Sequence, residues 1–408
     1  MEIKKREEFF LWSLFLLLPT QLGYHFWPRQ AYVWGLRVDF LSPAVYLTDL
    51  LIFCLLLFSW PLLKKAFLKD GKNKTKILIF CLVLSFLGFN ILFSLRPLVS
   101  FSRFLRAGEF FFLIFVLRKF YFPLWPQALL LGSLLSSFLA WGQVFKGGSL
   151  GGVFWWLGER SFNLATPGIA LAQLGSHVFL RPYATFSHPN SLAGFLLVLL
   201  LLLWGARASF KNKIFFKLAF LFFGLTLLLT FSFAAYLGAG LALIFFLWQR
   251  FSSRKISKAG FFLGLLFCLA VLSLSFEIGL VEPKSINDRL LLAKNALILI
   301  KERPLLGVGL GNFIPAQAEI ISATRKDVNL LQPVHNIYLL VASQAGLTGL
   351  LIFITLLFFW LKKVKKSSFP LARGALAMIF FLGFFDHYWL TLPQNFLLFA
   401  VVLGLGRV

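Results

Sequence analysis

Long apolar runs separated by short basic stretches are the feature that most constrains how this chain folds. A helix needs about 20 mostly apolar residues to cross the hydrocarbon core of a bilayer. Backbone polar groups in hydrocarbon must bond within their own segment, so the sequence predicts an all-α integral membrane protein. We expect about twelve transmembrane helices, near residues 9–25, 42–60, 77–94, 103–117, 125–145, 190–206, 214–231, 233–249, 259–277, 336–361, 370–386 and 392–406.

The composition agrees with this interpretation. Hydrophobic residues make up 59% of the chain and charged residues 13%, whereas soluble domains carry about 25% charged residues. The net charge of +25 does not indicate nucleic-acid binding, because the Lys and Arg residues lie in short clusters between apolar runs. Such clusters orient membrane proteins, so the predicted partner of most of the surface is the lipid bilayer.

The distribution of these basic clusters predicts the topology. Twenty-five of the forty Lys and Arg residues fall in short connections on one side of the predicted spans, and the positive-inside rule makes that side cytoplasmic. Both termini are then cytoplasmic, and two long loops, 146–189 and 278–335, lie outside. We expect one membrane domain, 1–408, with a small helical cap in loop 278–335, where a helix over 286–300 would end before Pro304.

Several arginines work against this charge distribution and are candidates for function. Arg181 precedes the sixth predicted span, Arg289 lies in the outer loop, and Arg103 and Arg106 lie at the start of the fourth span. Ionisable groups at membrane depth are costly and often functional, and a guanidinium group binds two phosphate oxygens at once. An outer arginine pocket would suit a lipid-linked phosphate or pyrophosphate. Headgroup anchoring or structural pairing is the alternative for each.

Two histidines lie next to asparagines at predicted outer ends of spans. His335 and Asn336 open the tenth span, where a neutral imidazole would be able to take a proton from a sugar hydroxyl. His188 precedes Pro189 and Asn190. Both members of this second pair are candidates for substrate binding, although His188 would also serve as a helix cap and Asn190 fits an N-cap.

Several common motifs are missing from the sequence. It has no Asp-x-Asp pair for a nucleotide-sugar metal site, no Walker or Rossmann motif and no His-Glu-x-x-His motif. Its three cysteines show no paired spacing. We therefore predict no metal and no cofactor, which leaves metal-free chemistry or transport.

Three stretches together resemble the O-antigen ligase and O-antigen polymerase superfamily. They are Arg181-Pro-Tyr-Ala-Thr-Phe-Ser-His-Pro-Asn-Ser-Leu-Ala-Gly194, the segment from Arg289 through Glu302-Arg-Pro-Leu-Leu-Gly-Val-Gly-Leu-Gly-Asn-Phe313, and His335-Asn-Ile-Tyr-Leu339 with Gly346-Leu-Thr-Gly-Leu350. Their order and spacing match that superfamily over residues 180–408. The N-terminal half resembles it by topology only.

The resemblance implies a membrane glycosyltransferase of the bacterial cytoplasmic membrane that faces the periplasm or the cell exterior. Its donor would be a glycan on polyprenyl pyrophosphate, and its acceptor a hydroxyl of a glycolipid or glycan such as lipid A–core. By resemblance, His335 would activate the acceptor, and Arg181 and Arg289 would hold the pyrophosphate. Asn336, Tyr338, His188, Asn190, Arg103 and Arg106 would contribute to substrate binding. The implied reaction is metal-independent and inverts the anomeric carbon.

The chain departs from the superfamily's pattern in one place, and other functions stay open. Relatives often have Ser-Arg-Gly at the start of the eighth span, where this chain reads Ser232-Phe233-Ala234. A chain polymerase is the alternative within the superfamily, and the second long loop leaves it open. A transporter or flippase of lipid-linked glycans belongs to a different class, although the inverted repeats typical of transporters are not evident. A peptidoglycan glycosyltransferase of the shape–elongation–division type would centre on Asp288.

Overall fold

The computed structural model describes residues 5–70, 74–120, 122–174, 176–250, 283–322, 327–364 and 370–406. These residues are predominantly helical, and their strands pair only as two-stranded antiparallel sheets. The chain divides into two compact units. The first comprises Met1–Leu14, Gly23–Phe122 and Asn287–Lys362, and the second comprises Phe15–Leu22, Pro123–Ile286 and Lys363–Val408.

The first unit combines long helices with a small subdomain formed by residues 23–46 and the described part of 283–335, which we call the outer subdomain after its predicted topology. Its long helices are α2 (Leu47–Asp70), α3 (Lys74–Leu92), α4 (Pro97–Lys119) and α12 (Ile337–Val364), and α4 packs against both α2 and α3. Two hairpins precede α2, in which β1 (Gly23–His25) pairs with β4 (Ala44–Tyr46) and β2 (Tyr32–Val33) pairs with β3 (Leu36–Arg37). The short 3-10 helices η1 (Arg29–Ala31) and η2 (Asp39–Leu41) flank the inner hairpin.

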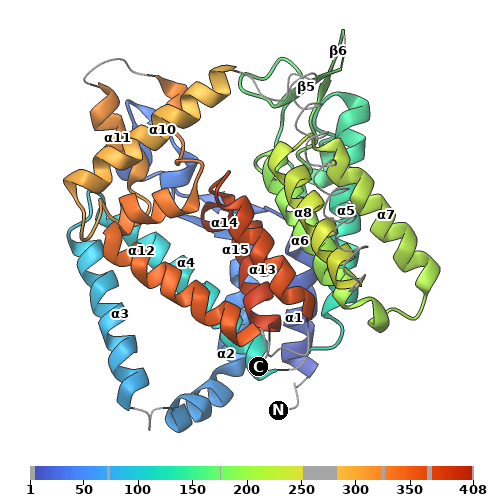
Figure 1. The fold of residues 1–408 in the computed structure, drawn as a ribbon, viewed down its shortest axis with the longest axis horizontal. Coiled ribbons are helices and arrows are strands. Elements are labelled where there is room, and N and C mark those ends of the chain that lie inside the picture. Colours follow the sequence, from blue (N-terminus) through green and yellow to red (C-terminus); the bar gives the residue numbers. More distant parts are fainter. Residues whose placement is uncertain are drawn as a thin grey trace. The chain divides into compact units, whose positions relative to one another are not determined.

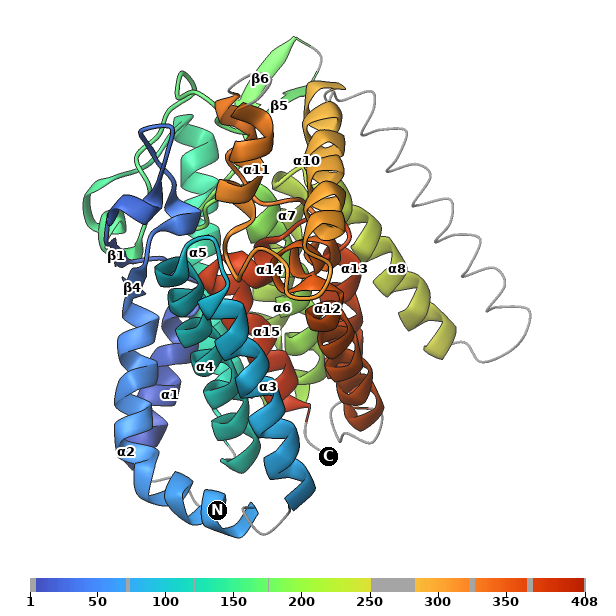
Figure 2. The same ribbon diagram turned by 90° about the vertical axis from the view of Figure 1, so that its left-hand side faces the viewer.

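The outer subdomain has its own hydrophobic core. Helices α10 (Pro283–Glu302) and α11 (Phe313–Ser322), followed by η5 (Val328–Leu330), lie close to the hairpins (Figures 1 and 2). One buried cluster joins residues of the hairpin region to residues of both helices: Ala31, Val33, Leu41, Leu292, Ala296, Phe313 and Ile314. The described residues of the predicted helical cap, 283–322 and 327–335, therefore share one packed core with the hairpin region.

Helix α12 is interrupted at Gly346, and this explains two glycine-rich stretches of the sequence. Gly346 has φ 69° and ψ −179°, a conformation that residues with a Cβ rarely adopt. Upstream of this kink the carbonyl of Ser343 accepts from Val308 N at 2.9 Å, and that of Gln344 accepts from Gly309 N at 3.0 Å. A Cβ on Gly346 would meet the backbone of Leu305. The glycines thus allow two backbones to approach closely.

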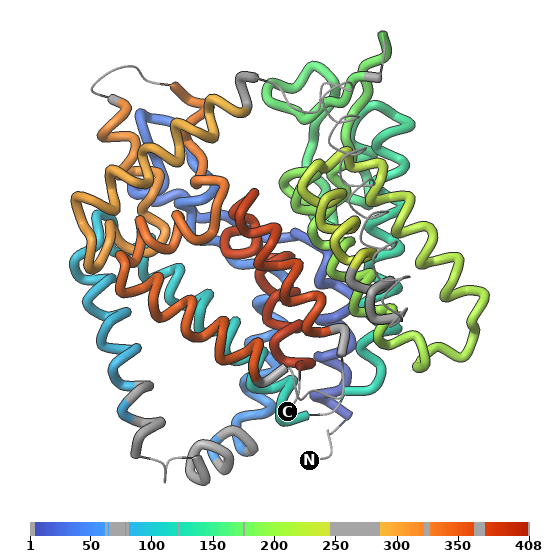
Figure 3. The backbone as a smooth tube through the Cα atoms, in the orientation of Figure 1, coloured from blue at the N-terminus to red at the C-terminus, as the bar shows by residue number. Residues whose placement is uncertain are grey.

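The second unit is built around α6 (Pro189–Gly205). This helix packs against α7 (Lys213–Leu229), α8 (Phe233–Arg250), α13 (Pro370–Leu382) and α15 (Pro393–Leu405). Helix α5 (Trp125–Lys146) packs on α7, and the short α14 (Tyr388–Thr391) packs on α15. Helices α6 and α7 are joined through η4 (Arg207–Ser209), and the chain path of the unit can be followed in Figure 3. The outer loop contains η3 (Gly152–Leu157) and a hairpin of β5 (Leu171–Leu174) and β6 (His177–Leu180).

Helices lie at every predicted span within the described residues, but the number of spans is not confirmed. Among the residues that the structure describes, two helical segments, Trp125–Lys146 and Ile337–Lys362, are long and apolar enough to cross a membrane. Shorter apolar segments include Leu47–Pro61, Pro189–Gly205 and Pro393–Leu405, which fall below the ~20 residues of a full span. The predicted span 259–277 lies outside the described residues.

Several predicted boundaries were wrong, among them the start of the fourth span, whose helix begins at Pro97 and not at residue 103. Helix α1 (Lys5–Leu17) stops well before residue 25, because Pro19 cannot continue a helix. The segment 42–60 begins as strand β4, and its helix starts only at Leu47. The segment 370–386 ends as a helix at Leu382. Apolar composition located these runs, whereas Pro19 ended the first helix and the pairing of β4 delayed the start of the second.

Candidate functional site

Arg106, on α4, is held by charged and polar groups of the first unit. Its Nη1 forms ion pairs with Asp49 and, at 3.0 Å, with Glu109. Its Nη2 donates to the carbonyl of Ala44 at 2.6 Å, and its guanidinium lies 4.9 Å from the centre of the Tyr46 ring. These contacts tie α4 to β4 and to the start of α2. They correspond to the structural pairing that the sequence left open for this residue.

Arg103 lies one turn before Arg106 and also bonds to the outer subdomain. Its Nη2 donates to the carbonyl of Phe40 at 2.5 Å. A Cβ on Gly311 would lie 2.9 Å from the Cγ of Arg103, so the glycine-rich loop closes over its side chain. The structure therefore gives Arg103 and Arg106 a fold-stabilising role, and their substrate-binding role stays a prediction.

Arg289 lies on the face of α10 that packs into the outer subdomain. Residues three, seven and ten positions later are Leu292, Ala296 and Leu299, all fully or almost fully buried, and this spacing places them on one side of a helix. Arg289 extends that buried side toward the N-terminus of α10 and is itself half-buried. Arg289 thus lies at the end of an apolar, buried helix face and stays partly accessible.

His335 and Asn336 lie immediately before α12, as predicted. Asn336 caps the helix, because its Oδ1 accepts from Tyr338 N at 2.9 Å and Leu339 N at 3.0 Å. His335 is half-buried, and its Nε2 lies 3.2 Å from Gln332 Oε1. If Nε2 carries the proton in this bond, the proton-accepting lone pair belongs to Nδ1. Asn336 thus fixes the backbone beside His335, and Gln332 fixes its ring.

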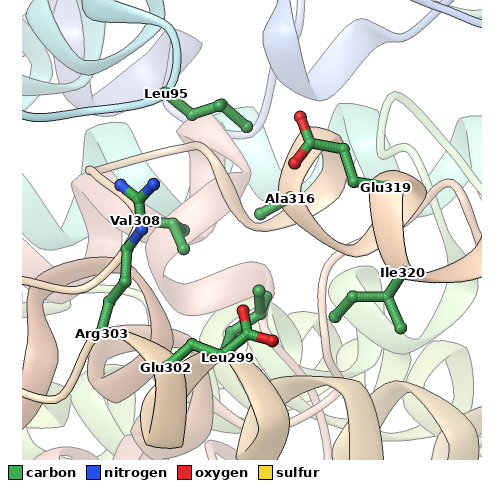
Figure 4. A pocket seen from close by; sticks show the side chains of 8 residues that line it. All are labelled: Leu95, Leu299, Glu302, Arg303, Val308, Ala316, Glu319 and Ile320. Carbon is green, nitrogen blue, oxygen red and sulfur yellow. The ribbon is translucent and has the colours of Figure 1, made fainter.

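A cavity of about 250 Å³ lies at the other end of α10, which Figure 4 shows from close by. The Arg303 guanidinium and the carboxylates of Glu302 and Glu319 surround it. Arg303 lies fourteen residues after Arg289, which is about 20 Å along a helix. Two carboxylates beside one arginine disfavour a pyrophosphate. This cavity is therefore separate from the candidate site near Arg289.

Arg181 is held between the end of α7 and the start of α6 in the second unit. Its Nε donates to the carbonyl of Thr230 at 2.8 Å, and its Nη2 donates to Asn190 Oδ1 at 2.6 Å. Thr230 ends α7 and Asn190 belongs to the first turn of α6. Arg181 and Asn190 were predicted separately as site residues, and the structure joins them by a hydrogen bond.

Asp386 and His387 extend this arrangement and were not among the predicted site residues. Asn190 Nδ2 lies 3.4 Å from Asp386 Oδ2, and His387 N donates to Asp386 Oδ1 at 2.8 Å. Both residues are 6% exposed, and His387 Nδ1 lies 2.7 Å from Thr391 Oγ1. An Asp-His pair between two apolar helices is the sequence feature that would have indicated them, because buried charges in such places are expensive.

His188 caps α6, and the expected cap at Asn190 was wrong. His188 Nδ1 accepts from Asn190 N at 3.1 Å, and Pro189 occupies the first helical position. Proline is favoured at the first helical position, so the residue before Pro189, His188, becomes the N-cap. The ring of Tyr183 lies 6.2 Å from the His188 ring, and burial raises the pKa of the Tyr183 hydroxyl.

The structure also shows where the eighth span lacks the arginine that the resemblance leads us to expect. Phe233 is the first residue of α8, three residues after the Thr230 carbonyl that Arg181 binds. Arg181 therefore reaches close to the position at which relatives often carry an arginine. The neighbourhood therefore contains Arg181 but not the second arginine that the resemblance leads us to expect at the start of α8.

These features describe a helical protein with helices apolar enough to cross a membrane and with arginines held by hydrogen bonds among them. A family model described as O-Antigen ligase matches residues 218–354. The match confirms the predicted resemblance and supports membership of the O-antigen ligase superfamily, with a membrane glycan ligase or polymerase type of function. The matched region contains Arg289, His335, Asn336 and Tyr338 and ends before Asp386. No curated protein matches the chain.

Proposed function

We propose that this protein transfers a glycan from polyprenyl pyrophosphate to an acceptor hydroxyl at the outer face of the membrane. The observation that carries the proposal is the O-antigen ligase match over residues 218–354, which contains Arg289 and His335. Glycolipids such as lipid A–core are the acceptor class that the superfamily suggests. A polymerase would use a second lipid-linked glycan as acceptor through the same chemistry.

Arg181 and Arg289 would stabilise the leaving pyrophosphate. Negative charge accumulates on the phosphate oxygens as the bond to the anomeric carbon breaks. Donors that are already oriented stabilise such charge without reorganising. Arg181 fits this requirement because two hydrogen bonds fix its guanidinium group, and Arg289 fits it because one face of α10 anchors it.

His335 would act on the acceptor. The acceptor oxygen attacks the anomeric carbon, the carbon–oxygen bond to pyrophosphate breaks, and polyprenyl pyrophosphate leaves with both bonding electrons. The hydroxyl proton passes to the imidazole and then to solvent. A single displacement of this kind inverts the anomeric carbon. The bond to Gln332 at 3.2 Å would set which ring nitrogen receives the proton.

The proposed topology places this chemistry outside the cytoplasm. About twelve spans with both termini inside put the loops that contain Arg181, Arg289 and His335 on the outer side, where basic residues are less common than in the inner clusters. Lipid-linked donor and glycolipid acceptor would then both reach the site from the bilayer. Cysteine labelling of single-cysteine variants at Lys213 and Lys294 with a membrane-impermeant reagent tests this topology, since only position 294 should react in intact cells.

The function is tested by reconstituting transfer with purified protein. Protein in detergent is incubated with polyprenyl-pyrophosphate-linked glycan and candidate acceptors, and transfer is followed by gel shift. We expect wild type to transfer the glycan, and His335→Ala and Arg289→Ala to abolish transfer while the protein stays folded. Lys294→Ala is the matched control, because Lys294 is an exposed cation on the same helix as Arg289.

The products distinguish the members of the superfamily. A single shifted band indicates one-step ligation, and a ladder indicates polymerisation. Transfer that survives both His335→Ala and Arg289→Ala would contradict the assigned residues. Movement of the lipid-linked glycan across vesicles without any transfer would favour the transporter alternative.

A further inference from the structure

The outer loop after α5 is anchored by a buried carboxylate. Glu159 is 4% exposed and accepts from Gln143 Nε2 at 2.8 Å, Leu150 N at 2.8 Å and Gly151 N at 2.7 Å. Gln143 lies in the last turn of α5, so these bonds fix the loop to the end of that helix. Burying a carboxylate is costly unless its oxygens accept hydrogen bonds in this way.

The same anchored loop holds large apolar side chains away from the protein. Within η3, Val153 is 75% exposed, Trp155 is 54% exposed and Trp156 is 66% exposed. The two tryptophan rings pack edge to face, with centroids 5.0 Å apart. A loop fixed at both ends yet presenting a contiguous apolar surface indicates contact with another apolar phase.

Helix α5 indicates that this apolar phase is the lipid bilayer. It has 22 residues, so it is about 33 Å long and matches a bilayer core of about 30 Å. Its exposed apolar residues Leu131, Leu135, Phe138 and Phe145 recur three, four or seven positions apart, which places them on one face of the helix. That face is suited to lipid, and it leads directly to the anchored loop.

We propose that η3 is an interfacial anchor, in which Trp155 and Trp156 insert into the headgroup region of the bilayer at the Lys146 end of α5. Tryptophan favours this region because its ring is largely apolar and its N–H can bond to water or headgroups. Exposed Arg160 follows the segment and suits lipid phosphates. The anchor does not depend on the proposed transfer reaction. Its role would be to hold the loop 147–170 at the membrane surface.

Spin labelling in nanodiscs tests the anchor. Cys54, Cys81 and Cys268 are replaced by alanine in the full-length chain, and nitroxides are attached at Trp155→Cys, Trp156→Cys and Ala165→Cys. Ala165 is the matched control, because it is exposed in the same loop but carries no large apolar side chain. The accessibility of each nitroxide to oxygen, which concentrates in lipid, is divided by its accessibility to a water-soluble nickel complex. We expect this ratio to be several times larger at positions 155 and 156 than at position 165.

Each other result overturns the proposal. Equal nickel accessibility at 155, 156 and 165 would place η3 in water. Low accessibility to both reagents would mean that a protein partner covers it. Nickel accessibility that falls on addition of a soluble oligosaccharide would identify a carbohydrate surface instead.

Intrinsic fluorescence provides a second measurement with conservative variants. The emission of Trp155 and Trp156 is obtained as the difference between wild type and Trp155→Phe/Trp156→Phe, since the chain has 12 tryptophans. We expect lipids brominated near the headgroup to quench this difference spectrum more than aqueous iodide does. Stronger quenching by iodide would overturn the anchor even if the cysteine variants failed to fold.

Discussion

Two arginine clusters, one around Arg106 and the other around Arg181, differ in the kind of partner that holds the guanidinium group. Arg106 is bound by the carboxylates of Asp49 and Glu109. Arg181 is bound by the neutral oxygens of Thr230 and Asn190. A carboxylate neutralises a guanidinium, whereas an amide or carbonyl oxygen orients it and leaves its net charge unchanged. The first arrangement suits stability, and the second suits the binding of an anion.

The first way to break this comparison is to remove Arg106. In Arg106→Ala the buried Asp49 loses its charge partner, and breaking a buried ion pair costs about 3–5 kcal/mol. We expect the largest loss of thermal stability in detergent for this variant. Arg181→Ala should lose clearly less, because the two oxygens of Thr230 and Asn190 that lose their donor are neutral. Equal losses for the two variants would show that the partners do not distinguish the clusters.

The second test compares the two arginines by activity. Arg181→Ala should lower transfer by roughly 10²–10³-fold, the range seen when one oriented donor to a developing negative charge is removed. Arg181→Lys keeps the charge but not the two fixed bonds, so it should recover only part of this loss. Initial rates of glycan transfer, measured at matched amounts of folded protein, provide the readout. Normal activity of Arg181→Ala would remove it from the site.

The third test converts one cluster toward the other. Asn190→Ala removes one of the two bonds to Arg181, and a hydrogen bond to a charged group is worth about 1.5–3 kcal/mol. We expect about a tenfold loss of transfer. Asn190→Asp keeps the bond but places a carboxylate beside Arg181, so it should impair transfer at least as much. An active Asn190→Asp variant would show that neutral partners are not needed.

The sequence predicted the helices because their information is local. Long apolar runs located α5, α6, α7 and α8 almost to the residue. The predicted outer helix 286–300 was also found, as α10, and it ends before Pro304. Helix α11 and the hairpins were missed. They are short, and their stability comes from a core shared with distant segments.

The candidate site was predictable only in part, for a related reason. Arg181, Arg289 and His335 stand out as charged or titratable residues in characteristic local patterns. The contact between Asn190 and Asp386 joins residues 196 positions apart, and no local pattern indicates it. The contacts of Arg106 with Asp49 and Ala44 likewise depend on how α4 packs against α2 and β4. Sequence thus identified the charged residues but not their partners, and the partners separate a structural arginine from a candidate functional one.

The smallest expected effect on transfer is that of replacing His188, which bonds to Asn190. This replacement tests whether the Arg181 cluster extends to His188. As the cap of α6, His188 accepts a hydrogen bond from Asn190 N at 3.1 Å. Loss of an N-cap costs about 1 kcal/mol, so His188→Ala should slightly lower thermal stability. His188→Asn should restore it, because asparagine is a good cap. Transfer rates at matched folded protein should stay close to wild type in both variants. A large loss of transfer in the asparagine variant, with stability intact, would assign His188 to substrate binding and extend the Arg181 cluster by one residue.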